Sequence, residues 1–208
     1  MIRRVASLAA GLAVMWIVNA SPLAHLDHHL LTAHMVQHLL LMLVAAPLIL
    51  FAARPIVAQW QPQLTLCWLA GTVTVLAWHV PAIFELALQS QFWHRFEHAS
   101  FFIAGILFWW PVVQPAPYSR WSMPVYLFLA TLPCDALSAF LAFCGHVVYR
   151  PYMSIHDGLF GLSPLDDQAL AGALMWVTVT FAYLIPALVL MARLLSSERK
   201  RATDALVA

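Results

Sequence analysis

Charged side chains are scarce in this sequence of 208 residues. Asp, Glu, Lys and Arg make up 9% of the chain, whereas an average soluble domain contains about 25%. The hydrophobic fraction is 63% and the mean hydropathy is +0.82. Because so few charged residues cannot cover a water-facing surface, the composition excludes a soluble globular protein and indicates a membrane protein.

Cysteine is also rare, and regular alternation of apolar and polar residues is missing. Cys67, Cys134 and Cys144 are too far apart for a Cys-x-x-Cys metal site, and they suggest no disulfide framework. Strands of a membrane barrel would alternate over roughly ten residues, so helices are left as the spanning elements. There is no internal repeat, and the net charge of +1 gives no reason to expect nucleic acid as a partner.

Six apolar segments are long enough to cross a bilayer as helices, which takes about 17–25 residues. We therefore predict an all-α, polytopic membrane protein that forms a single domain over residues 1–208. The first segment follows "MIRR", so a cleaved signal peptide is the competing interpretation, although a retained helix is preferred. The predicted transmembrane helices cover roughly residues 5–20, 31–53, 63–80, 95–113, 124–148 and 169–193, followed by a solvated tail over 194–208.

The distribution of basic residues predicts the orientation in the membrane. With the N-terminus in the cytoplasm, Arg95 and Arg150 alone among the ten basic residues face outside. Positively charged residues collect on the cytoplasmic side of membrane proteins. Both termini are therefore predicted to be cytoplasmic.

All ten histidines fall at or near the predicted outer ends of these helices. Seven of the nine carboxylates also lie away from the cytoplasmic side. This asymmetry predicts that the chemistry of the protein takes place at its outer end. The histidines are His25, His28, His29, His34, His38, His79, His94, His98, His146 and His156.

Two pairs of histidines have the spacing of neighbours on a helix face. His34 and His38 open the second helix and His94 and His98 open the fourth, each pair four residues apart. Imidazoles at this spacing lie on one helix face and are the commonest metal ligands in proteins. Two pairs at the same depth would supply up to four nitrogens to a metal ion. The alternative is that they are polar residues at the membrane interface. His79, in "WHVP", is either a ligand from the third helix or a polar cap at its end.

Several carboxylates are further candidates. Asp166 and Asp167 open the sixth helix, where Asp is a common helix-start residue, but a carboxylate there would also suit a metal or orient a histidine. Asp135 lies near the middle of the fifth helix, where an ionisable group is costly; it is a functional candidate or is bonded to a neighbouring helix. The loop "HLDHH" would capture metal or simply be polar surface.

The stretch "HRFEH" also matches the H-x-x-E-H pattern of inverted zinc peptidases. In that interpretation His94 and His98 would hold zinc and Glu97 would act as general base. The pattern is short, and the second histidine pair has no role in such an enzyme. An intramembrane zinc peptidase is therefore kept as a minor alternative.

Four segments together resemble a known family. They are "AHMVQHLLLMLVAAPLI", "WHVPAIFELAL", "HRFEHASFFIAGILFWWPVV" and "DDQALAGALMW", and they look like the CtaG-type assembly factors of caa-type cytochrome c oxidases. The resemblance covers roughly residues 31–193. It implies a multi-pass protein of the bacterial plasma membrane that helps to mature the haem–copper oxidase. Carried over by motif, it marks His34, His38, His79, His94, His98 and Asp167.

These six residues form the predicted metal site. Copper is the expected ion, because the ligands are rich in nitrogen, cysteine is absent from the cluster and the site faces outward. Zinc and haem are the alternative cofactors, and a haem-binding electron carrier is the alternative function. The protein is expected to be no enzyme. Its expected partners are the lipid bilayer, an oxidase subunit that receives the copper and a periplasmic copper donor.

Overall fold

The protein is a bundle of helices. A computed structural model describes residues 1–57, 59–114, 121–154 and 159–207. These ranges contain no strand and 87% of the chain is helical, which confirms the predicted all-α class. The helices are α1 Ile2–Ala20, α2 Leu23–Leu26, α3 Leu31–Leu39, the π-helical η1 Leu40–Ala45, α4 Ala46–Val57, α5 Leu64–Trp78, α6 Pro81–Gln89, α7 Gln91–Val113, α8 Ser122–Phe143, the 3₁₀ helices η2 Arg150–Ser154 and η3 Leu159–Gly161, and α9 Pro164–Val207.

Five helical stretches within the described residues are long and apolar enough to cross a membrane. A sixth span results if the bent pair α5 and α6 is counted as one. The prediction of a multi-pass helical membrane protein is therefore confirmed, with five to six candidate spans.

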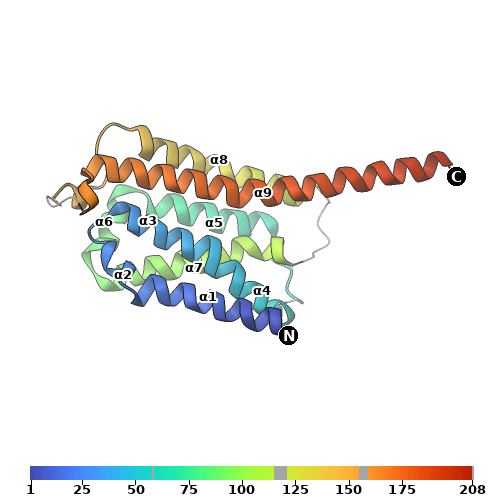
Figure 1. Ribbon diagram of the computed structural model, residues 1–208, viewed down its shortest axis with the longest axis horizontal. Coiled ribbons are helices and arrows are strands. Elements are labelled where there is room, and N and C mark those ends of the chain that lie inside the picture. Colours follow the sequence, from blue (N-terminus) through green and yellow to red (C-terminus); the bar gives the residue numbers. More distant parts are fainter. Residues whose placement is uncertain (58, 115–120, 155–158, 208) are drawn as a thin grey trace.

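The third predicted helix is shorter than expected and is followed by a sharp bend. It was expected over residues 63–80, but α5 ends at Trp78 and α6 leaves it at 76°. Pro81 explains the break, because a residue before proline is driven out of the helical conformation, and Val80 is extended. Because the chain bends at this proline, α6 turns away from α5 and lies at the end of the bundle (Figure 1).

The last helix is longer than the sequence indicated. It was predicted over residues 169–193 with a solvated tail, whereas α9 runs from Pro164 to Val207. Ser163 and Asp166 start it with reciprocal hydrogen bonds: the Ser163 hydroxyl donates to the Asp166 carboxylate and accepts from its backbone N–H. The C-terminal part of α9 extends beyond the other helices (Figure 1).

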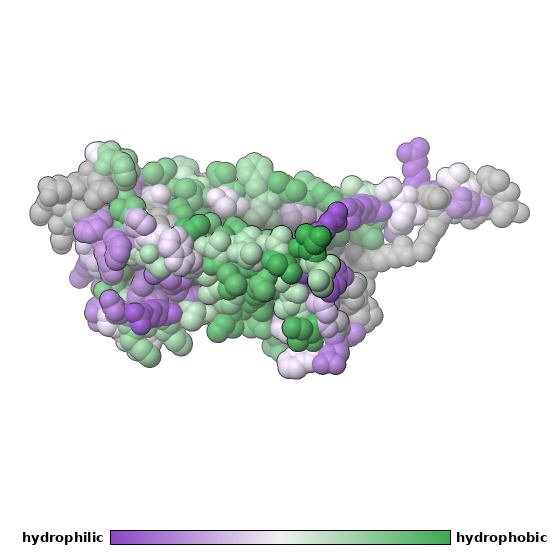
Figure 2. All heavy atoms as spheres, turned by 60° about the horizontal axis from the view of Figure 1, so that its bottom comes forward, coloured by the Kyte–Doolittle hydropathy of each residue, from purple (hydrophilic) through white to green (hydrophobic). Residues whose placement is uncertain are grey.

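Both termini lie at the same end of the bundle, and α2 and α6 lie at the other (Figure 1). Figure 2 shows an apolar band around the middle of one face, with hydrophilic residues gathered toward the two ends. This distribution suits a protein surrounded by lipid. Which end faces the cytoplasm stays a prediction. Arg120, His156 and Asp157 lie outside the described residues.

Glycines allow the closest helix approaches. A Cβ added to Gly105 on α7 would lie 2.8 Å from the Ala46 side chain and 3.0 Å from the Met42 backbone. A Cβ added to Gly172 on α9 would lie 2.7 Å from the Ala142 nitrogen of α8, which agrees with the close packing that small residues favour in membranes.

A π-helical segment, η1, begins two residues after His38. Pro47 lacks an N–H and would crowd the preceding turn of a regular helix, whereas the wider η1 turn accommodates it. The Trp109 indole N–H donates to the Met42 carbonyl at 3.0 Å, which ties η1 to α7. Together with Gly105, this bond fixes α7 against the helix that carries His34 and His38.

Candidate metal centre

The two histidine pairs face each other between α3 and α7. The ring centroids of His34 and His94 are 5.7 Å apart, and those of His38 and His98 are 5.6 Å apart. Within the pairs the distances are 4.4 Å on α3 and 4.2 Å on α7. Four imidazoles from two helices that are distant in sequence thus converge at the α2–α6 end of the bundle.

The carboxylate of Glu97 lies among these rings. Its Oε1 is 3.4 Å from Nε2 of both His34 and His38, and its Oε2 is 3.7 Å from Nδ1 of His94. The Glu97 side chain is 0% exposed. A carboxylate removed from solvent needs positive charge beside it, which protonated imidazoles or a bound cation would supply.

A second carboxylate, Asp27, reaches the cluster from the turn between α2 and α3. Its Oδ2 lies 2.9 Å from Nε2 of His94, and its side chain is buried. The Tyr152 hydroxyl donates to the Asp27 carbonyl at 2.6 Å and fixes the turn. Burial by itself would raise the pKa of Asp27, but the hydrogen bond with His94 and the charges of His94, His28 and His34 outweigh it. The pKa therefore lies below its ordinary value, and Asp27 stays ionised.

These residues form two sets of converging ligand atoms. One set is Asp27, His34 and His94, and the other is His34, His38 and Glu97. Within each set the ligand atoms lie within 4.8 Å of one another. Both sets combine one carboxylate with two imidazoles, and they share His34. We call them the outer set and the inner set.

Several buried polar atoms of the cluster have no hydrogen-bond partner among the described residues. They include both ring nitrogens of His38, Nδ1 of His34, Nε2 of His98 and Oε2 of Glu97. Each such atom costs about 1–3 kcal/mol if it stays unpaired. Imidazole nitrogens and carboxylate oxygens are the donors that copper and zinc accept, so the residues fit a metal ion.

His79 lies near the inner set but outside it. Its Nδ1 donates to the Val75 carbonyl at 2.7 Å, which leaves Nε2 as the acceptor nitrogen, buried and without a partner among the described residues. A backbone bond on one ring nitrogen is typical of a histidine that binds metal through the other. His79 and His38 both line a small cavity of about 30 Å³ with Met35, Met42, Met175 and Cys134.

Asp167 is bonded to the start of α3 and not to the histidines. Its carboxylate accepts the backbone N–H groups of Leu31 at 2.6 Å and Thr32 at 3.1 Å. Leu30, the residue before α3, has no side chain that caps a helix, so Asp167 supplies the cap from α9. It belongs to neither ligand set.

The whole sequence was compared with known families, curated proteins and solved structures. The family model described as cytochrome c oxidase caa3 assembly factor (Caa3_CtaG) matches residues 1–197. The chain belongs to this family. No curated protein and no solved structure matched. The resemblance seen in the sequence is confirmed, and it indicates an assembly role that involves the oxidase and the lipid bilayer.

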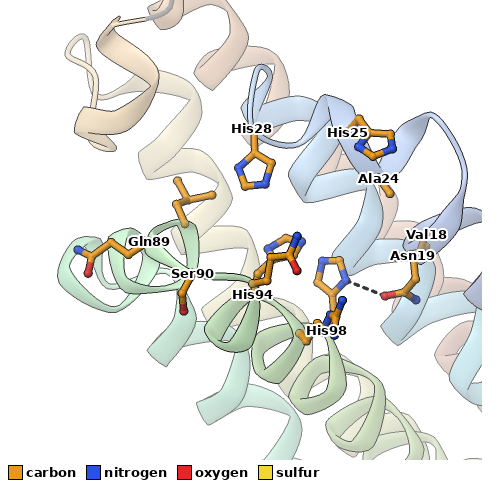
Figure 3. Close-up of a pocket in the computed structure, with 12 residues that line it drawn as sticks. Val18, Asn19, Ala24, His25, His28, Gln89, Ser90, His94 and His98 are labelled. Atoms are coloured by element: carbon orange, nitrogen blue, oxygen red, sulfur yellow. Dashed lines mark hydrogen bonds between the residues drawn. The ribbon is translucent and has the colours of Figure 1, made fainter.

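In this caa3 assembly factor a pocket of about 630 Å³ adjoins the cluster. Figure 3 shows His25, His28, His94 and His98 around it. Nδ1 of His98 donates to the Asn19 side-chain oxygen at 3.3 Å, which places the end of α1 against α7. The pocket thus lies between the C-terminal end of α1, helix α2 and the start of α7.

Other candidates from the sequence lie away from the ligand sets. The Thr180 hydroxyl on α9 donates to Asp135 at 2.9 Å, so this carboxylate is bonded to a neighbouring helix. His146 is exposed and its Nδ1 donates to the Cys144 carbonyl at 2.8 Å. Neither belongs to a ligand set among the described residues.

The sequence analysis left Glu97 and Asp27 out of the predicted site. Glu97 was considered only as a peptidase base, although its place between His94 and His98 on one helix indicates that it reaches the same centre. Asp27 was considered only as part of the loop "HLDHH", which would capture metal or be polar surface. Its burial depends on Tyr152, which lies 125 residues further along the chain, and no local pattern reveals that contact.

Proposed function

We propose that this assembly factor binds a copper ion through its inner set and transfers it to the haem–copper oxidase. The observation that supports the proposal is the convergence of four imidazoles and a buried carboxylate, several of whose polar atoms lack hydrogen-bond partners among the described residues. In this proposal copper is cargo, and the protein keeps no catalytic role.

Copper is favoured over other metals by the donors in and around the cluster. Imidazole nitrogens bind copper more strongly than most first-row metals. The cavity beside His38 and His79 contains the side chains of Met35, Met42 and Met175, whose thioethers suit copper(I). A purely structural zinc site would instead be expected to have four fixed ligands and to be closed.

Delivery requires that the metal centre face the compartment where the oxidase receives copper. We propose that the α2–α6 end lies on the outer side of a bacterial plasma membrane and that both termini lie in the cytoplasm. Support comes from the start of α1, which carries Arg3 and Arg4, and the end of α4, which carries Arg54. Both helix ends lie toward the opposite end of the bundle (Figure 1). A periplasmic copper donor would then load the protein.

Metal analysis of the detergent-purified protein tests the proposal. We expect about one copper per chain after loading, since the two ligand sets share His34. The double change His34→Ala/His94→Ala should remove it. His146→Ala is the matched control, because this exposed histidine lies outside both sets and its loss should leave the copper content unchanged.

Three results would contradict the proposed site or function. Copper that survives in the double variant would mean that the site lies elsewhere. A haem absorption band in the purified protein would favour an electron carrier. A substrate cleaved by the wild type but not by Glu97→Gln would favour the zinc peptidase.

A further inference from the structure

We infer that the outer set is an intermediate binding site through which copper passes from the pocket to the inner set. The inference rests on the proposed function and adds a route to it. In this route Asp27 and His94 receive the ion first, and His34 passes it on to His38 and Glu97. Nothing in the family description assigns Asp27 or His28 a role.

Asp27 is held in a fixed position, as a metal ligand must be. The Tyr152 hydroxyl bonds its carbonyl, and Asp27 Oδ1 accepts the His28 backbone N–H at 2.7 Å. Its other oxygen faces Nε2 of His94 at 2.9 Å. A buried carboxylate on a short turn, with one oxygen bonded to a backbone N–H and the other facing an imidazole, is well placed to attract and hold a cation.

The pocket connects the outer set with the surroundings of the protein. His28 and His94 both line the pocket, and their Nε2 atoms lie 3.9 Å and 2.9 Å from the Asp27 carboxylate. The His28 side chain is 53% exposed, whereas those of His34 and Glu97 are 0% exposed. The exposed fraction of the side chain therefore falls from 53% at His28 to 16% at His94 and 0% at His34.

The two sets have the chemistry that a transfer path requires. Each offers one carboxylate and two imidazoles, so an ion keeps a similar coordination when it moves between them. Because His34 belongs to both, the ion exchanges its other ligands without leaving the protein. Sites along a conduction path must bind strongly enough to admit an ion and weakly enough to release it. Two sets with the same kinds of ligand are expected to differ little in affinity, so neither would trap the ion.

The rate of copper uptake by the full-length protein in detergent tests the route. Copper(I) is offered in a coloured chelate, and the loss of colour after rapid mixing follows its transfer. Asp27→Asn should slow uptake about tenfold, because the negative charge that draws the cation is removed. The final copper content should equal that of the wild type, since the inner set is intact.

Two further variants make the test decisive. Asp166→Asn removes an exposed carboxylate that lies outside both sets, and it should load at the wild-type rate. His28→Ala changes an exposed side chain at the pocket and should slow uptake even if Asp27→Asn fails to fold.

The outcomes separate the route from the proposed function. Wild-type uptake rates in both Asp27→Asn and His28→Ala would overturn the route and leave copper binding intact. A final copper content in Asp27→Asn as low as in Glu97→Gln would also overturn it, because Asp27 would then be a permanent ligand. A wild-type protein that takes up no copper would overturn both.

Discussion

The two ends of the helix bundle differ in the burial of the ionisable residues compared here. At the end that contains α2 and α6, Asp27, His34 and Glu97 are buried and face one another. Toward the other end, Arg3 and Arg4 are exposed on α1. Burying charged groups in a membrane protein is costly, so such groups usually mark a functional site. We therefore expect the functional site at the end that contains α2 and α6.

The largest expected effect is that of pH on the buried end. Imidazole binds metal only when neutral, and its ordinary pKa is about 6.5. Lowering the pH to 5 should weaken copper binding, because protons then compete with the ion for the imidazole nitrogens. Asp27 stays ionised over this range because its pKa is lowered, so the carboxylate does not cause the loss.

Chelator competition between pH 8 and pH 5 measures this effect. The direction of the pH dependence follows from the ligands. Protons compete with the metal for the imidazole nitrogens as the pH falls, so copper is lost at low pH and retained at high pH. An affinity that is constant down to pH 5 would mean that imidazoles do not hold the ion.

Glu97→Gln should have the next largest effect. It removes the carboxylate that faces His34, His38 and His94 while keeping the side-chain shape. We expect copper affinity to fall at least about a hundredfold, measured by competition with a chelator. Glu85→Gln on α6 is the control at the same end, and its affinity should stay at the wild-type value because Glu85 is in neither set.

Gly105→Leu should disturb the position of α7 without touching a ligand. The new side chain would collide with Met42 and Ala46, and overpacking of this kind costs about 1–3 kcal/mol. Thermal unfolding in detergent should shift to lower temperature, and copper affinity should fall as the two histidine pairs separate. Ala99→Leu on the exposed side of α7 is the matched change and should leave both unchanged. Equal behaviour of the two variants would argue against fixed α7 packing.

Asp167→Asn should have the smallest effect. It weakens the bonds to the Leu31 and Thr32 N–H groups, and a weakened cap costs about 1 kcal/mol of unfolding free energy. Copper content should remain, because Asp167 contacts no ligand nitrogen. Complete loss of copper in a folded Asp167→Asn protein would instead make Asp167 a ligand. Glu198→Gln, an exposed change on the same helix, should alter neither property.

The sequence predicted the helical class and the meeting of the two histidine pairs for simple physical reasons. Low charge and long apolar runs leave no fold but membrane helices, and a spacing of four places both imidazoles of a pair on one face. The sequence alone was therefore enough to select the four candidate ligands His34, His38, His94 and His98. That α3 and α7 pack together is known only from the structure.

The remaining features depend on contacts between distant parts of the chain. Asp167 has the sequence context of a helix-start residue, but its carboxylate caps α3, 135 residues earlier. Asp27 is buried by Tyr152, and α9 continues as a helix through a tail whose polar composition favoured a solvated end. Local propensity cannot report such contacts, because the partners come together only in the folded bundle.

X-ray absorption spectroscopy of the copper-loaded protein tests the metal centre most directly. The proposed site predicts copper surrounded by nitrogen and oxygen atoms, with the outer-ring scattering of imidazole, and loss of that scattering in His34→Ala/His94→Ala. A spectrum dominated by sulfur neighbours, or imidazole scattering that is unchanged in the double variant, would contradict it.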